Sequence, residues 1–379
     1  GKMKNKIGIL NFQYSDHNYG AVLQAVALEN VLKQLGKNAE HINFIPKKKG
    51  NKNIKQFIIE FLASIGLKPF IYRVFNKKVI IKNKVEGSEI FEDFRNKYLN
   101  RTKAFHSLND LMELEDSYSS VIVGSDQVWR PKMYSDLTEI EIYFLSFISQ
   151  KTKKISYAAS FGVERWEYDK NDNVTHKAQK YLNKFNSISV REKSGVDICN
   201  SVFDIRAEHV LDPTLLIGRD FFDNLIKDKQ PLVQKTISYY KLDLCESFLA
   251  GIEHLANLTG YETNNIYYKQ LNNGSYEYYP VLDWLSMINS SSIIITDSFH
   301  CVCFSILFNK SFYCCLNKER GASRLESLLN ELGLQDRLIS EEELSRIYTI
   351  VDINYSPVED ILNKHRKQSI EFLVSAIDG

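Results

Sequence analysis

Three observations predict an α/β fold with two domains, each built around a parallel sheet. The chain has 379 residues, which is enough for two domains that each bury a core of their own. Residues 7–45 are patterned as strand, polar loop, helix and strand, which is the order of a βαβ unit. Short apolar runs followed at once by polar residues then recur along the chain. This alternation predicts further parallel strands in both domains.

The first unit begins with the apolar run 7–12, which a polar loop over residues 13–20 follows. From Ala21 onward apolar side chains recur with the period of a helix, and Gly36 is placed to end that helix as a C-cap. Residues 41–45 form the second predicted strand. We expect the two strands of this unit to pair in parallel.

Later apolar runs are predicted to be buried strands of the same kind. They cover residues 121–123, 155–159, 188–190, 210–211, 236–240, 266–268 and 293–296. The polar residues that follow these runs include Asp126, Arg191 and Asp297. Because open α/β sheets place their ligand crevice at the carboxyl ends of the strands, we expect the functional site at this edge.

The boundary between the domains is predicted near residues 217–231, where a lysine-bearing stretch separates two series of strands and helices. We expect an N-terminal Rossmann-like domain over residues 1–222, with a basic helical insert at 47–100. A C-terminal Rossmann-like domain is expected over residues 223–345. Residues 346–379 are predicted as a helical tail that can pack back on the N-terminal domain.

Charge and composition exclude several classes of protein. The 48 basic and 47 acidic residues leave a net charge of +1, so no overall field draws the protein to nucleic acid. None of the six cysteines shows C-x-x-C spacing and most lie in or beside apolar runs, so we expect reduced cysteines in the core. The sequence has neither an apolar stretch long enough to span a bilayer nor a secretory signal, which predicts a cytoplasmic protein.

Five motifs, spread over roughly residues 7–337, occur in one order along the chain: Asn18-Tyr-Gly-Ala-Val-Leu-Gln24, Val121-Ile-Val-Gly-Ser-Asp-Gln-Val-Trp129, Ser187-Ile-Ser-Val-Arg-Glu192, His209-Val-Leu-Asp-Pro213 and Ile295-Thr-Asp-Ser-Phe-His300. In sequence and in order they resemble the motifs of polysaccharide pyruvyl transferases. The resemblance implies a GT-B-like architecture, in which two Rossmann-like domains face each other across a cleft. The N-terminal domain would bind the acceptor and the C-terminal domain the donor.

The same resemblance implies a reaction. The enolpyruvyl group of phosphoenolpyruvate would be transferred to a sugar as a pyruvate ketal, with release of phosphate. The sugar would belong to a cell-surface glycan, such as an exopolysaccharide or a capsule, or to its lipid-linked precursor.

This reaction sets requirements for the site. The donor carries a carboxylate and a phosphate, so the site needs cations or oriented N–H groups. The donor methylene must gain a proton and the sugar hydroxyl must lose one, so a general acid and a base are needed. The scheme demands no metal and no cofactor, and the sequence has no clear metal cluster. Residues 13–20 contain too little glycine for a dinucleotide fingerprint, which excludes a nicotinamide cofactor.

The resemblance assigns donor binding and catalysis to His300, and donor binding to Arg191. His300 opens a helix-like run, where backbone N–H groups and the helix dipole converge. Arg191 ends a predicted strand, and a guanidinium matches a carboxylate or phosphate with two parallel hydrogen bonds. Two other interpretations stay open: a structural hydrogen bond at His300, and a surface ion pair of Arg191 with Glu192 or Asp197.

The chain departs from the family pattern at one donor-site position. Some relatives have an arginine two residues before the histidine, where this chain has Ser298. A phosphate-binding cation is therefore missing there, and Arg320 or Arg324 could replace it from the next connection. If neither does, the assignment of the donor weakens.

The candidate acceptor residues lie in the N-terminal domain. Asp126 and Gln127 follow a strand, with Gly124 permitting a tight turn. Asp126 could accept a proton from the acceptor hydroxyl, hold the sugar, or simply cap the next segment. The residues predicted to contact the acceptor are Asn18, Tyr19, Gly20, Asp126 and Gln127.

Two further side chains permit two interpretations each. Trp129 is predicted to pack in the core, although its face could also lie over a sugar ring. Asp297 could serve the site or act as an N-cap for the run that follows.

Two alternative functions remain. A GT-B glycosyltransferase would use a nucleotide sugar and would need an acidic ribose clamp, which the sequence does not show clearly. A glycan-binding member of the fold without catalysis would permit a blocked anion site or a His300 that is turned away. The fold alone does not decide among these functions.

The segment 47–84 carries eleven basic residues against one acid, Glu60, with apolar and aromatic residues between them. Such a segment can pack its apolar side on the sheet or lie on an anionic membrane leaflet, and the two are compatible. A lipid-linked acceptor would favour peripheral contact with the inner face of the membrane.

The membrane contact can be measured with vesicles. Replacing the lysines of residues 47–84 by glutamine should weaken cosedimentation with anionic vesicles, because each basic residue near such a surface contributes about 1 kcal/mol. Neutral vesicles serve as the control. Unchanged binding after the substitutions would contradict membrane contact through this segment.

Overall fold

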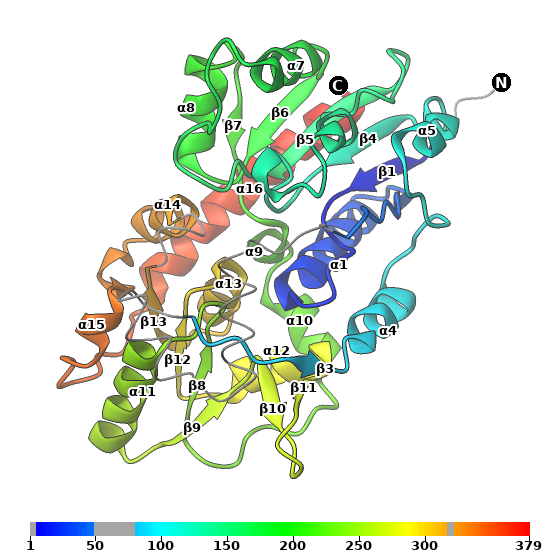
Figure 1. Ribbon diagram of the computed structural model, residues 1–379. Helices are drawn as coiled ribbons and strands as arrows, with labels where there is room; N and C mark the ends of the chain where they lie inside the picture. The colour runs from blue at the N-terminus through cyan, green and yellow to red at the C-terminus, as the bar shows by residue number, and fades with distance from the viewer. Residues whose placement is uncertain (1–4, 49–79, 317–321) are drawn as a thin grey trace.

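The computed structural model describes residues 5–48, 80–316 and 322–379. Figure 1 shows two parallel sheets, one from the N-terminal and one from the C-terminal part of the chain, with helices packed around both. The predicted α/β fold with two Rossmann-like domains is therefore confirmed. Residues 49–79, which make up most of the basic segment 47–84, lie outside the described residues, as does Arg320.

The N-terminal sheet has six parallel strands in the order β2-β1-β4-β5-β6-β7. The chain adds β2 on one side of β1 and β4 on the other, so the strand order reverses beside β1. In sheets of this type ligands bind at the carboxyl edge near such a reversal. The strands are β1 (Ile7–Leu10), β2 (Ala39–His41), β4 (Ser120–Val123), β5 (Lys153–Ala159), β6 (Ser187–Val190) and β7 (Glu208–His209).

The helices of this part follow the predicted alternation. The first, α1, has Asn18 as its N-cap, and Gly36 just beyond its end has a φ of 76°, as a C-cap glycine requires. The helices are α1 (Tyr19–Gln34), α4 (Glu89–Tyr98), α5 (Leu108–Leu111), α6 (Ile140–Tyr143), α7 (Asn173–Leu182), α8 (Lys193–Ser201), α9 (Pro213–Ile217) and α10 (Arg219–Ile226).

The C-terminal sheet has five parallel strands in the order β14-β13-β12-β8-β9. Its strands are β8 (Thr236–Tyr240), β9 (Glu262–Asn265), β12 (Ile293–Thr296), β13 (Ser311–Cys315) and β14 (Leu338–Ile339). Its helices are α11 (Glu246–Thr259), α12 (Val281–Ser290), α13 (Phe299–Leu307), α14 (Ser323–Glu331) and α15 (Glu341–Leu344).

Three predicted strands are shifted in the structure. The strand expected at 41–45 lies at Ala39–His41, and the strand expected at 210–211 lies at Glu208–His209. The run 266–268 falls between β9 and β10 (Tyr268–Gln270). In each case the apolar residues are buried directly beside the strand. The apolar pattern therefore predicted the buried region correctly, but not which residues form the hydrogen bonds of the sheet.

A small third sheet links the two parts of the chain. β3 (Val85–Glu86) pairs in parallel with β11 (Tyr276–Tyr278), which pairs with β10. The backbone N–H of Ile81 also donates to the carbonyl of Leu244, with an N···O distance of 2.7 Å. The described end of the predicted insert is therefore attached to the C-terminal domain.

The chain ends with the helix α16 (Ser356–Asp378), drawn in red in Figure 1. It contacts both α9 and β5, so it returns to the N-terminal domain. Lys153 Nζ donates to the carbonyl of Ile377 at 2.9 Å. Among the described residues, no helix is both long and apolar enough to cross a bilayer.

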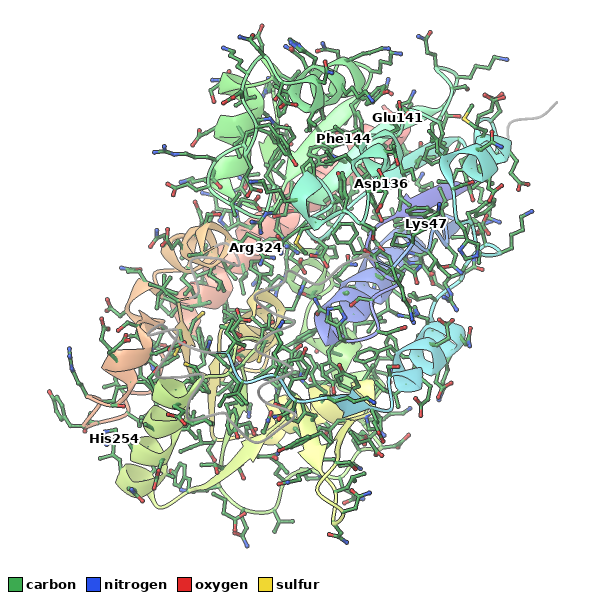
Figure 2. All side chains as sticks on the ribbon, viewed as in Figure 1. Lys47, Asp136, Glu141, Phe144, His254 and Arg324 are labelled. Atoms are coloured by element: carbon green, nitrogen blue, oxygen red, sulfur yellow. The ribbon has the colours of Figure 1, made fainter. Side chains whose placement is uncertain are left out.

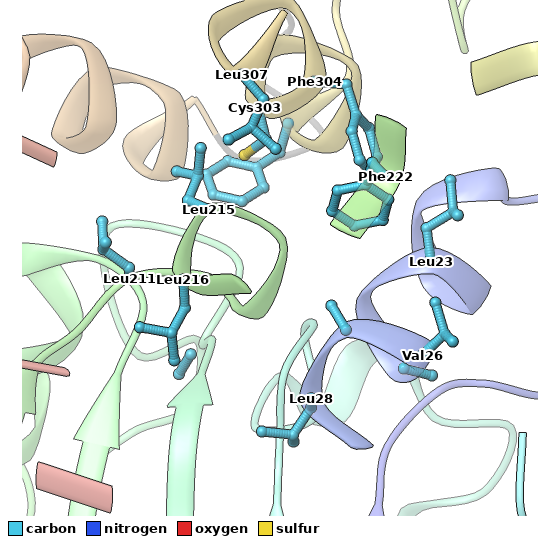
Figure 3. Close-up of a cluster of buried hydrophobic side chains, with 14 of the residues drawn as sticks. Leu23, Val26, Leu28, Leu211, Leu215, Leu216, Phe222, Cys303, Phe304 and Leu307 are labelled. Atoms are coloured by element: carbon cyan, nitrogen blue, oxygen red, sulfur yellow. The ribbon is translucent and has the colours of Figure 1, made fainter. Parts of the chain in front are cut away.

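One apolar core continues from the N-terminal into the C-terminal domain. Figure 3 shows part of it, where Leu23 of α1, Leu215 of α9, Phe222 of α10 and Phe304 of α13 are gathered. All six cysteines are buried and free, as predicted for reduced core residues.

Tyr19, the first residue of α1, anchors the N-terminal domain in the C-terminal one. Its ring is fully buried and stacks on Trp284 with 4.9 Å between ring centroids. Its hydroxyl donates to the carbonyl of Tyr267 at 2.8 Å and accepts the N–H of Tyr279 at 3.1 Å.

Removing only this hydroxyl tests the link between the domains. Tyr19→Phe removes two hydrogen bonds, each worth about 0.5–1.5 kcal/mol, so the free energy of unfolding should fall by about 1–3 kcal/mol. Urea unfolding measures the change. Tyr348→Phe is the control, since Tyr348 is 86% exposed and its substitution should change stability by less than about 0.5 kcal/mol. Equal stability of Tyr19→Phe and the wild type would contradict this role.

Candidate functional site

Polar side chains from both domains meet between the two sheets. Asp126 follows β4 and Arg191 follows β6 in the N-terminal domain, while His300 lies in the first turn of α13 after β12. All three are buried, as is Arg324 on α14. The carboxyl edges of the two sheets therefore supply one cluster of charged groups, as the strand pattern predicted.

Arg191 is held by a buried ion pair and retains unused donors. Its Nη1 lies 2.8 Å from Oδ2 of Asp212 and 3.0 Å from Oγ of Ser125, and the guanidinium centre is 4.3 Å from the centre of the Phe299 ring. Its Nε and Nη2 are buried without a hydrogen-bond partner among the described residues. Buried donors of this kind are costly, so they point to an anion that would accept from them.

The partner of Arg191 corrects one interpretation from the sequence. A surface ion pair with Glu192 or Asp197 is wrong, because Arg191 is only 3% exposed and pairs with Asp212. Burial opposes the positive charge, but Asp212 and then Asp126 act against it and raise the pKa of Arg191. The guanidinium therefore stays charged inside the protein.

Asp212 joins the groups of the site, and the sequence did not single it out. Its Oδ2 receives contacts from Arg191, Ser125 and His300, and its Oδ1 accepts the N–H and the hydroxyl of Thr214 at 2.9 and 2.6 Å. Burial would raise its pKa, but His300 and Arg191 outweigh this and hold the pKa well below its usual range.

A signal for part of this role was present in the sequence. Asp212 precedes Pro213, which is typical of an N-cap followed by proline at the first helical position, and Asp212 does cap α9. Its partners Arg191 and His300 are distant in sequence, and no local pattern could identify them.

His300 connects the C-terminal domain to this carboxylate. Its Nε2 lies 3.0 Å from Oδ2 of Asp212, so the structural hydrogen bond considered for it exists and crosses between the domains. A Cβ on Gly20 would lie only 2.5 Å from Nδ1 of His300. The glycine at the start of α1 therefore lets the helix pack directly against the imidazole.

Arg324 lies beside Arg191. Its guanidinium centre is 5.5 Å from the centre of the Phe299 ring, the same ring that Arg191 contacts. Burial, and then the charge of Arg191, lower the pKa of Arg324 to about 10, while Asp126 and Glu192 oppose this. Figure 2 labels Arg324 between the two sheets, in the region where α14 approaches α8. The structure therefore places a second buried cation beside Arg191.

Ser298 and Asp297 have separate structural tasks. Ser298 is the N-cap of α13, and its Oγ accepts the N–H of Cys301 at 3.3 Å. Asp297 does not cap this helix, which corrects that interpretation. Its carboxylate pairs with Lys241 at 3.2 Å and accepts the N–H of Leu242 at 2.8 Å.

Asp126 occupies a strained turn after β4. Its φ is 79°, and its Oδ1 accepts the N–H of Gln127 at 2.8 Å, a local bond of the kind that the capping interpretation anticipated. A Cβ on Gly124 would collide with the carbonyl of Tyr157, so the glycine is required there. The carboxylate acts electrostatically on both Arg191 and Arg324, which places it at the cation cluster.

The predicted acceptor residues do not all lie at one site. Asn18 caps α1, and Gly20 adjoins His300. Gln127 Oε1 lies 3.4 Å from Nη1 of Arg130. The side chain of Tyr19 does not line the site, because it is fully buried in the aromatic core; this corrects its assignment as an acceptor contact.

Arg95 and Trp129 support the structure around this region. Arg95 of α4, which the sequence did not single out, donates to the carbonyls of Gln13 and Ser15 at 2.9 Å and so fixes the first loop. Trp129 is fully buried and stacks on Phe144, which confirms its packing role.

The cluster is suited to binding an anion and moving a proton. The guanidinium of Arg191 lies 3.4 Å from the imidazole of His300 and is held by the carboxylate of Asp212, and the guanidinium of Arg324 contacts the same Phe299 ring as Arg191. Within the described residues, no three His, Cys, Asp or Glu side chains are grouped closely enough to hold a metal ion.

Comparison with known proteins gives a family and several structural relatives. A family model described as polysaccharide pyruvyl transferase matches residues 18–319. A search of curated protein sequences gave no match.

Solved structures with a similar fold include the UDP-N-acetylglucosamine 2-epimerase from Rickettsia bellii, with 9% identity, a TM-score of 0.49, and coverage of 98% of this chain and 97% of that chain. The UDP-GlcNAc 2-epimerase from Neisseria meningitidis bound to UDP-GlcNAc has 11% identity, a TM-score of 0.48, and coverage of 98% and 99%. UGT89C1 of Arabidopsis thaliana complexed with UDP-L-rhamnose has 9% identity, a TM-score of 0.43, and coverage of 100% and 98%.

The contact between Gly20 and His300 can be tested with a single methyl group. Gly20→Ala should displace the imidazole and reduce the activity assigned below by about 100-fold, as misplacement of a reacting group by about 1 Å does. Steady-state kinetics measure the loss. Gly251→Ala is the control, because its Cβ would crowd Leu344 at 2.6 Å, in a separate apolar core of the C-terminal domain. Equal losses in both variants would contradict a specific effect on the imidazole.

Proposed function

Because the chain belongs to the polysaccharide pyruvyl transferase family, we propose that it transfers the enolpyruvyl group of phosphoenolpyruvate to a sugar as a pyruvate ketal. The observation that carries this proposal is the buried guanidinium of Arg191 beside His300. Its Nε and Nη2 have no hydrogen-bond acceptor among the described residues. A donor with two anionic groups would satisfy these nitrogens. Phosphate is the second product.

Arg191 and Arg324 would bind the donor. A guanidinium presents two parallel N–H groups, which match either the carboxylate or the phosphate of phosphoenolpyruvate. Both arginines contact the ring of Phe299, so their separation is set by the same side chain. Arg324 would then supply the cation that relatives have at the position of Ser298.

His300 would carry the proton. Protonation of the donor methylene creates an oxocarbenium-like carbon, which one sugar hydroxyl attacks. The bond from this carbon to the phosphate oxygen then breaks, and a second hydroxyl closes the ketal. The two sugar hydroxyls lose one proton each. One of these protons replaces the proton that formed the methyl group, and the other leaves with the phosphate. Asp126, at the edge of the cation cluster, is the proposed base for an acceptor hydroxyl.

The acceptor would approach from the N-terminal domain. Asn18 and Gly20 lie at the start of α1, after β1, and Gln127 follows β4, all at the carboxyl edge of that sheet. The proposed acceptor is a sugar of a cell-surface glycan or of its lipid-linked precursor. A lipid carrier would place the reaction at a membrane surface. The basic segment 47–84 would bind the anionic lipids of that surface.

Phosphate release from phosphoenolpyruvate tests the donor and the histidine together. Wild-type protein is incubated with the donor and a panel of pyranosides that includes galactosides. We expect release that depends on the acceptor and falls by about 10²–10⁴-fold in His300→Ala, since general acid–base catalysis contributes that much. Arg191→Lys should raise the KM for the donor by about 10–100-fold, because the charge remains but the fork of donors is lost.

Arg219→Lys is the matched control for Arg191→Lys. Arg219 lies over the ring of Phe308 at 5.7 Å and pairs with Asp223, but it belongs to α10, outside the cluster. Its kinetics should equal those of the wild type. No release with any acceptor, together with no calorimetric binding of phosphoenolpyruvate, would overturn the proposed donor and favour a nucleotide sugar or a non-catalytic role.

A further inference from the structure

The hydrogens around Asp212 can be counted from the donors that surround it. Nη1 of Arg191 carries two hydrogens, and its two close partners are Oδ2 of Asp212 at 2.8 Å and Oγ of Ser125 at 3.0 Å. The single hydroxyl hydrogen of Ser125 points to the same Oδ2, at 3.0 Å. Arg191 therefore has no Nη1 hydrogen left for Nε2 of His300, which lies 3.4 Å away.

This count decides which nitrogen of His300 bears the proton. An ionised carboxylate only accepts hydrogen bonds, and Asp212 is kept ionised by the donors around it. The contact of 3.0 Å between its Oδ2 and Nε2 of His300 is therefore a bond that Nε2–H donates. In the neutral imidazole the lone pair then lies on Nδ1.

Nδ1 lies on the edge of the imidazole that packs against Gly20. A Cβ at that position would come within 2.5 Å of Nδ1, 2.6 Å of Cβ and 2.7 Å of Cγ of His300, so only a glycine leaves this edge without a side chain over it. The Nε2 edge is occupied by Asp212 and Arg191. The two edges of the imidazole thus differ, one fixed by buried charges and the other next to a glycine.

We propose that Asp212 is the positioning residue of this site: it fixes His300 with a proton on Nε2, so that Nδ1 exchanges the proton with substrate. This inference rests on the proposed function for its chemistry. Nδ1–H of the imidazolium gives its proton to the donor methylene, whose C=C electron pair forms the new C–H bond. The electron pair of the broken N–H bond stays on Nδ1 as a lone pair, and the neutral imidazole keeps the hydrogen bond from Nε2–H to Asp212.

The carboxylate of Asp212 orients His300, but its negative charge opposes the binding of an anion. Asp212 places a negative charge 2.8 Å from the guanidinium that would bind the donor. Removing that charge should therefore leave anion binding unchanged or tighter, while the orientation of His300 is lost. Simple damage to the fold would weaken both.

Imidazole ¹⁵N chemical shifts measure the tautomer in the full chain without any substrate. The protein is labelled at histidine, and the signal of His300 is the one missing from His300→Ala. We expect Nε2-protonated neutral imidazole in the wild type, and loss of this preference in Asp212→Asn. In the same variant kcat should fall by about 10²–10⁴-fold, while the Kd for inorganic phosphate, from calorimetry, should not rise.

Asp297→Asn is the matched control. Asp297 is also a buried aspartate paired with a buried cation, Lys241, but its carboxylate has no contact with His300 among the described residues. This variant should lose stability and keep the tautomer of His300. A change of tautomer in Asp297→Asn equal to that in Asp212→Asn would overturn the specific role of Asp212.

The remaining outcomes separate this inference from the proposed function. A wild-type His300 protonated on Nδ1 would overturn the inference even if Asp212→Asn failed to fold. An Asp212→Asn protein with the wild-type tautomer and kcat would overturn it as well. Wild-type protein that releases no phosphate, yet shows the expected tautomers, would overturn the donor assignment and support the positioning of His300 by Asp212.

Discussion

The negative charge of Asp212 is enclosed between the two domains, where it has to be balanced by groups from both. Arg191 comes from the end of β6 and His300 from the start of α13, and each lies within 3.0 Å of the same oxygen. A buried charge without such partners would be strongly destabilising. The position of α13 relative to the N-terminal sheet is therefore constrained by electrostatics, and with it the position of the imidazole.

Apolar packing reinforces that constraint. The core is continuous across the domains, and Tyr19 reaches from α1 to stack on Trp284 in the other domain. Domains joined by a small polar interface move easily, whereas a large hydrophobic one resists motion. The two buried arginines and the imidazole are thus held in place by the surrounding core. Such preorganisation is what electrostatic catalysis requires.

The sequence predicted those features that depend on neighbouring residues. Buried strands followed by polar residues located Arg191 and His300 at the carboxyl edges of the sheets, and helical periodicity with Gly36 gave the extent of α1. Features that depend on distant partners were missed. The capping pattern at Asp212 contained no sign of its cations, and the loop position of Tyr19 suggested a ligand contact although the side chain is buried in the other domain.

The path of the chain has a consequence for how this protein can change over generations. β3 leaves the N-terminal part to pair with β11, and α16 returns from the C-terminal part to contact β5. A genetic exchange with a single junction near the domain boundary would combine β3 from one parent with β11 from another, and likewise α16 with β5. Both pairs would have to remain complementary. Inheritance of new specificity should therefore proceed by point substitution within loops rather than by exchange of a whole domain.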